Sequence, residues 1–84
     1  MEIREIWGVP YARCEAFFLS QDDVRKRAEG QFCFGDCEIR LVALPSLERG
    51  PLRFPQTELR LTGSGEDARE IHRRFVLRFI SAGA

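Results

Sequence analysis

The most regular pattern of apolar and polar positions lies at the end of the chain and predicts an amphipathic helix. Between residues 66 and 83, apolar side chains recur at about 100° per residue, as they do along one face of a helix. A capping-box arrangement, Ser64 to Asp67, precedes this stretch, and Gly83 supplies a stop signal. The predicted buried stripe consists of Ala68, Ile71, Phe75, Phe79 and Ala82.

Two central segments alternate between apolar and charged residues and predict strands with one wet face. Residues 37–44 place Cys37, Ile39, Leu41 and Ala43 on one side, and residues 57–62 place Leu59 and Leu61 there. The outward charges predict cross-strand pairs, either Glu38 with Arg60 or Arg40 with Glu58. Residues 45–51 are predicted to form a loop, and Pro55 predicts a sheet edge or a bulge.

The first third of the chain carries overlapping signals. A capping box from Ser20 to Asp23, followed by Gly30, predicts a helix over residues 21–29. Residues 12–19 alternate as a half-buried strand does, and we favour that interpretation because a capping box inside a longer helix would be wasted. The apolar residues of 12–19 also fall at helical spacing behind Pro10, so one long helix stays open as the alternative.

These elements predict a single α+β domain over residues 1–84. Their order is strand-helix-strand-strand-helix, with a small antiparallel sheet of three to four strands and both helices packed on one face. A chain of 84 residues is long enough for one core and too short for two domains. The connectivity resembles a ferredoxin-like unit without its final strand, and that fold hosts many unrelated functions.

Charge and cysteine content narrow the environment and the partners. Thirteen basic and thirteen acidic residues cancel, so no net field steers the chain to nucleic acid or to an anionic membrane. No apolar run approaches the ~20 residues that span a bilayer, and the N-terminus lacks the pattern of a signal peptide. An odd number of cysteines, three, indicates reduced thiols, so we expect a cytoplasmic protein without a membrane partner.

Catalytic and metal-binding signatures are weak. Cys14, Cys33, Cys37 and His72 make up a numerically complete zinc ligand set, but the usual double pair of closely spaced ligands is missing. We therefore expect the cysteines to be core thiols and His72 to be a partly buried residue with a structural hydrogen bond. No catalytic motif is visible, which predicts a non-enzymatic protein without a cofactor.

The last helix is more apolar than one buried face requires, and this surplus predicts an interaction surface. Its candidate residues are Arg73, Arg74, Val76, Leu77, Arg78 and Ile80, an apolar patch rimmed by arginine. The leading hypothesis is a protein-interaction or assembly module that binds a second copy or another protein through this helix and a sheet edge. A nucleic-acid-binding module that uses the arginines comes second, because Glu70 can pair with Arg73 and Arg74.

Overall fold

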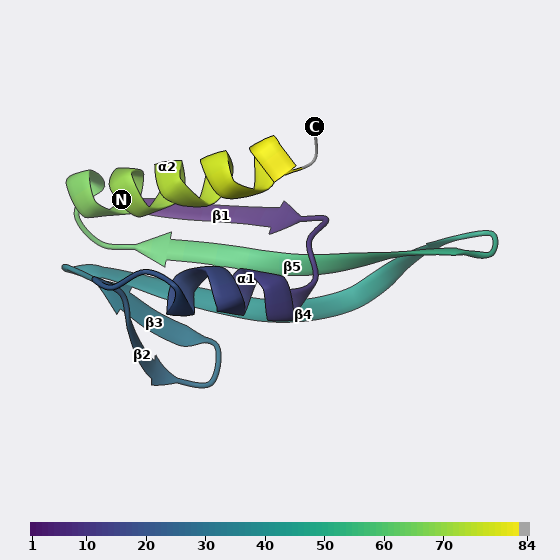
Figure 1. Ribbon diagram of the computed structural model, residues 1–84, viewed down its shortest axis with the longest axis horizontal. Helices are drawn as coiled ribbons and strands as arrows, with labels where there is room; N and C mark the ends of the chain where they lie inside the picture. The colour runs from purple at the N-terminus through teal and green to yellow at the C-terminus, as the bar shows by residue number, and fades with distance from the viewer. Residues whose placement is uncertain (83–84) are drawn as a thin grey trace.

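The protein is an α+β domain in which one antiparallel sheet carries helices on one face only (Figure 1). The computed structural model describes residues 1–82. Its elements are β1 (Glu2–Trp7), α1 (Tyr11–Leu19), β2 (Arg25–Ala28), β3 (Gln31–Phe34), β4 (Cys37–Arg49), β5 (Leu52–Thr62) and α2 (Gly65–Ala82). The five strands lie in the order β1-β5-β4-β3-β2. The predicted class and the antiparallel sheet are confirmed, whereas the predicted number and order of strands are wrong.

Residues 11–19 form helix α1, which contradicts the predicted strand over 12–19. Pro10 precedes the first turn, and its carbonyl accepts hydrogen bonds from the backbone N–H groups of Arg13 and Cys14. The segment forms a helix because a helix buries Cys14, Phe17 and Phe18 together against the sheet. The helix type of the alternative is therefore confirmed, although α1 ends at Leu19 and is not one long helix.

The predicted helix over residues 21–29 is also wrong. Ser20 follows the last turn of α1, and its hydroxyl donates to the carbonyl of Phe17 at 2.6 Å, so it caps no helix of its own. Residues 25–28 form β2, whose side chains are all exposed. A helix here would bury little apolar surface, whereas a strand pairs with β3 through a tight turn at Gly30.

Strand β1 was missed because a carboxylate interrupts its apolar face. Ile3, Glu5 and Trp7 alternate toward the helices, and a charged residue among them hides the pattern. The structure satisfies Glu5 locally: Trp7 Nε1 donates to its carboxylate at 3.0 Å, and His72 Nε2 lies 2.8 Å from the same oxygen. Burial acts to raise the pKa of Glu5, but these hydrogen bonds outweigh it and lower that pKa below its usual value.

Strands β4 and β5 run far beyond their predicted ends, so the predicted loop over 45–51 is wrong. They pair through Arg49 and Leu52, and the turn between them lies at Gly50 and Pro51. The register shifts between Leu44 and Leu47, opposite Pro55, and this bulge confirms the irregularity predicted there. We call residues 44–56 the arm, because β1 and β3 do not extend along this part of the hairpin (Figure 1).

Helix α2 confirms the strongest prediction. Ala68, Ile71, Phe75 and Phe79 of its stripe are buried, and Phe75 stands within 5.6 Å, between ring centroids, of Phe17, Phe18, Phe79 and Trp7. Ser64 Oγ accepts from the N–H of Asp67 at 3.3 Å, which is half of the predicted capping box. The carboxylate of Asp67 instead accepts from the N–H of Asp36 at 3.0 Å. The predicted stop at Gly83 lies outside the described residues.

Candidate functional site

The arginines predicted to form an interface on α2 are partly engaged inside the fold. Arg73 and Arg74 both bind the carboxylate of Glu70, and Arg74 also reaches Asp23 at 2.9 Å. Hydrogen bonds from Arg73 and Arg74 lower the pKa of Glu70 to about 2. The guanidinium of Arg74 lies 4.9 Å from the ring centre of Phe34. These contacts tie α2 to the segment after α1 and leave Arg74 little freedom to bind a partner.

The apolar residues of the same predicted interface form a small patch. Leu77 and Ile80 are 53% and 61% exposed, whereas Val76 is half-buried. The guanidinium of Arg78 lies 5.6 Å from the ring centre of Phe79. At about 100° per residue, Leu77 and Ile80 share one side of α2, whereas Arg78 lies nearly opposite Val76, and two exposed apolar side chains are ordinary for a protein surface.

The zinc ligand set proposed as a weak alternative is not assembled. Cys14 and Cys37 are buried, and burial raises the pKa of the Cys14 thiol to about 11. His72 contacts Glu5 rather than a cysteine. Across residues 1–82, no group of three or more histidine, cysteine, aspartate or glutamate side chains is arranged to hold a metal ion. The predicted structural hydrogen bond of His72 is confirmed.

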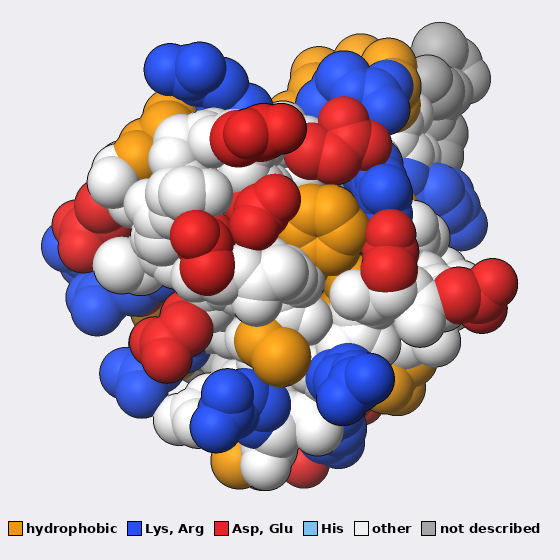
Figure 2. Space-filling model, turned by 90° about the vertical axis from the view of Figure 1, so that its left-hand side faces the viewer, with side chains coloured by type: hydrophobic (Ala, Val, Ile, Leu, Met, Phe, Trp, Pro, Cys, Tyr) orange, Lys and Arg blue, Asp and Glu red, His pale blue; other side chains and the backbone are white. Residues whose placement is uncertain are grey.

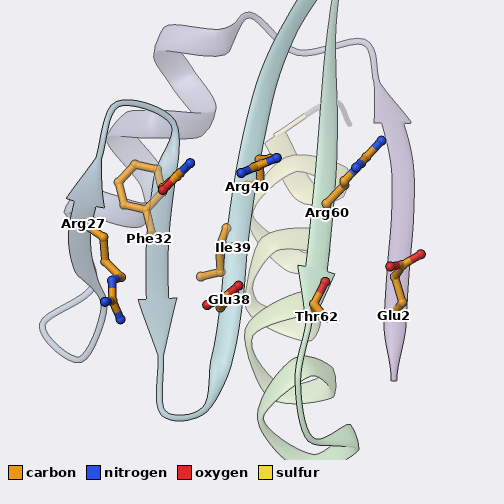
Figure 3. A pocket seen from close by; sticks show the side chains of 9 residues that line it. Glu2, Arg27, Phe32, Glu38, Ile39, Arg40, Arg60 and Thr62 are labelled. Carbon is orange, nitrogen blue, oxygen red and sulfur yellow. The ribbon is translucent and has the colours of Figure 1, made fainter.

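The helix-free face of the sheet is the larger candidate surface. Because side chains alternate along a strand and directly opposite residues share a face, the register identifies which residues lie there. Figure 3 looks onto this face with α2 behind the sheet. Its residues form successive rows across the strands: Arg25, Cys33, Glu38, Thr62 and Glu2; then Ala28, Gln31, Arg40, Arg60 and Arg4; then Val42, Glu58 and Ile6.

Three arginines stand directly opposite one another in the second of these rows. Arg60 pairs with Arg4 on β1 and with Arg40 on β4, so both predicted ion pairs, Glu38–Arg60 and Arg40–Glu58, are wrong. We call these three residues the arginine row. The sequence could not reveal it, because alternation shows which face a residue occupies but not which residue lies across from it.

Glu58 binds two members of the arginine row. It is only 5% exposed, and its carboxylate binds Arg4 at 3.0 Å and Arg60 at 2.8 Å. Burial acts to raise the pKa of Glu58, but the hydrogen bonds and charges of the two arginines lower it below its usual value. Within residues 1–82, Arg40 has no carboxylate within 4.0 Å. Three guanidinium groups against one carboxylate leave the arginine row with a surplus of positive charge, and Arg40 is the member that Glu58 does not bind.

A cavity of about 390 Å³ opens beside the arginine row. Arg27, Gln31, Arg40 and Arg60 line it together with two acidic residues of the neighbouring row (Figure 3). These acidic residues, Glu2 and Glu38, have no basic partner within 4.0 Å in the described part of the chain. Arg40 and Arg60 thus stand at one level of the cavity and the two carboxylates at the next, whereas the guanidinium of Arg27 lies level with Glu38 (Figure 3). Its polar lining suits hydrogen bonding to a charged small molecule.

Toward the arm, the same face becomes apolar. Its exposed residues are Ile6 (59%), Val42 (38%), Leu47 (40%), Leu52 (58%) and Phe54 (44%), and we call this set the apolar arm surface. The opposite face of the arm is polar, since Arg53 and Glu48 form a salt bridge there at 3.2 Å. This surface could not be predicted from the sequence, because the prolines and glycine of the hairpin are also typical of a loop.

Neither a general electrostatic field nor a known relative identifies the partner. Figure 2 shows acidic and basic side chains interspersed over the end of the molecule where α2 begins, without a field of one sign. No protein-family model matches the chain, and no curated protein matches it. Within residues 1–82, neither helix has the length and apolar character needed to cross a membrane.

Proposed function

We propose that this protein is a non-enzymatic assembly module that associates with a second copy through the apolar arm surface. The observation that carries the proposal is that the arm is an amphipathic two-stranded ribbon, along which residues 1–82 place no third strand or helix. A two-stranded ribbon is marginally stable in water by itself. A second layer on its apolar face would both order the arm and remove Leu47, Leu52 and Phe54 from water.

The energy available from burying the apolar arm surface is consistent with weak association. Full burial of a large apolar side chain contributes about 1.5–3 kcal/mol. The apolar arm surface has five such side chains, so two copies bring ten. Each is about half exposed in one copy, so dimerisation would gain roughly half of the full burial energy, about 8–15 kcal/mol. The cost of bringing two molecules together is about 4–15 kcal/mol. We therefore expect a dimer that forms and dissociates with concentration.

A second copy is a chemically matched partner, because it carries the same apolar surface. A two-fold axis places the same patch on both molecules, so apolar side chains meet apolar side chains. The arm also projects along the longest dimension of the molecule, 42 Å against 27 and 23 Å, where a second arm can reach it without meeting the helices (Figure 1). The engagement of Arg73 and Arg74 with Glu70 and Asp23 disfavours nucleic-acid binding through α2.

Sedimentation velocity over a wide concentration range tests the proposal. The double variant Leu47→Ser/Phe54→Ser should stay monomeric at concentrations where the unchanged protein dimerises. The matched control is Leu77→Ser/Ile80→Ser on α2, which should dimerise as the unchanged protein does. Circular dichroism confirms that both variants fold. A monomer at every concentration overturns the proposal, and so does dimerisation that only the α2 variant abolishes.

A further inference from the structure

The arginine row poses a problem that self-association through the arm does not solve. Residues directly opposite in a sheet have Cβ atoms about 4.5–5.5 Å apart, so like charges there destabilise the pair. Glu58 offsets this repulsion for Arg4 and Arg60 but does not reach Arg40. Arg40 is therefore a positive charge with no carboxylate within 4.0 Å in the described part of the chain.

A second observation lies one row away. Glu38 precedes Arg40 by two residues on β4, and Glu2 precedes Arg4 by two residues on β1, so the backbone positions of the two glutamates lie about 7 Å along the strands from the arginine row. The cavity between them opens to solvent on the helix-free face (Figure 3). Neither Glu38 nor Glu2 is neutralised by a basic side chain within 4.0 Å in the described chain. The cavity therefore offers unmatched charges of both signs.

We propose that this cavity binds a small zwitterionic molecule that carries an oxyanion at one end and an amino group at the other. The guanidinium of Arg40 would hold the oxyanion by two parallel hydrogen bonds, with the amide of Gln31, directly opposite on β3, beside it. The carboxylates of Glu38 and Glu2 would accept from the ammonium group. The volume of about 390 Å³ falls within the range of ligand pockets, about 300–1,000 Å³.

The charge pattern selects against a polyanion. A phosphate backbone crossing this face to reach Arg40 and Arg27 would also pass Glu2 and Glu38, whose charges repel it. A short molecule with one anionic and one cationic group can place the anionic group at the arginine row and the cationic group at Glu2 and Glu38. The site is also separate from the arm itself, residues 44–56, since Val42, Glu58 and Ile6 form a row between the arginine row and the arm.

The test uses matched probes in a ¹H–¹⁵N NMR titration that also observes the arginine side chains. Phosphoethanolamine has both charged groups, ethyl phosphate lacks the amine, and ethanolamine lacks the phosphate. We expect saturable shifts at Arg27, Gln31 and Arg40 with phosphoethanolamine, weaker binding of ethyl phosphate, and none of ethanolamine. Arg40→Gln should weaken phosphoethanolamine binding about tenfold or more. Glu38→Gln should reduce it to the level of ethyl phosphate.

The control variant is Arg49→Gln, which removes an exposed arginine at the far end of β4 and should bind as the unchanged protein does. Shifts that do not saturate, equal binding of phosphoethanolamine and ethyl phosphate, or unchanged binding by Arg40→Gln would overturn the proposal. The titration is repeated on Leu47→Ser/Phe54→Ser. Unchanged binding by that variant separates the ligand site from dimerisation, so that either proposal can fail while the other stands.

Discussion

Gly30 permits a quantitative test of how the β2–β3 hairpin is held against the sheet. Its φ angle of +71° is one that L-residues with a side chain rarely adopt. A Cβ atom added there would lie 2.7 Å from the carbonyl oxygen of Leu41 and 3.1 Å from the hydroxyl of Tyr11. The carbonyl of Gly30 also accepts from the N–H of Leu41 at 2.8 Å, so this approach is part of the sheet.

Gly50 supplies the matched comparison, because its φ is +60° but no atom lies within 4 Å of an added Cβ. A left-handed conformation costs a residue with a side chain about 1–2 kcal/mol, and the stiffer unfolded chain returns about 0.4–1 kcal/mol, so Gly50→Ala should destabilise by about 1 kcal/mol. Gly30→Ala adds a backbone clash comparable to overpacking, about 1–3 kcal/mol, and should cost about 2–4 kcal/mol.

Urea denaturation followed through the fluorescence of Trp7 measures both variants. Trp7 is the single tryptophan and packs edge-to-face on Phe75, with 5.1 Å between ring centroids, so it reports on the core. A domain of this length has a free energy of unfolding of about 4–13 kcal/mol, so both losses are measurable if the denaturant slope is unchanged. Equal losses of unfolding free energy for Gly30→Ala and Gly50→Ala would refute the close approach of Gly30, in the turn before β3, to Leu41 of β4.

Two further predictions concern titrating groups. The pKa of Glu70, about 2, lies below its value in an unfolded chain, so the unfolded state binds more protons in acid and this contribution to stability is lost as the pH falls from about 5 to about 2. Thermal melts should therefore show a smaller acid-induced drop in Tm for Glu70→Gln than for the unchanged protein, and equal drops would contradict the assignment. In the folded protein a thiol reagent should modify the half-exposed Cys33 first, whereas Cys14, whose pKa burial raises to about 11, should react only on unfolding. Mass spectrometry checks this order, and early labelling of Cys14 would show that it is not buried.

The sequence by itself determines those elements whose apolar periodicity fits only one type of secondary structure. The stripe of α2 and the alternating cores of β4 and β5 are of this kind, because burying them as any other element would expose Phe75 or Leu61 to water. The same reasoning predicts antiparallel strands beneath two helices. It also predicts the partly buried environment of His72 and the pairing of Glu70 with Arg73 and Arg74, which need only neighbours on one helix.

Only the tertiary structure decides where local signals conflict. Residues 12–19 satisfy both a strand and a helix, and the helix wins because it brings Cys14, Phe17 and Phe18 onto the same core. The capping signals after Ser20 fail because the segment has no apolar face to bury. Strand β1 becomes a strand despite Glu5, because Trp7 and a residue far along the chain, His72, satisfy that carboxylate.

The candidate sites are also decided only by the tertiary structure. Sequence alternation places Arg4, Arg40 and Arg60 on an outward face, but their alignment in one row follows from the register of three strands, which distant pairing sets. The apolar arm surface likewise exists only because residues 45–51 continue the strands through Leu47 instead of forming a loop. Periodicity is a property of neighbours along the chain, whereas a binding surface depends on which neighbours the fold brings across from one another.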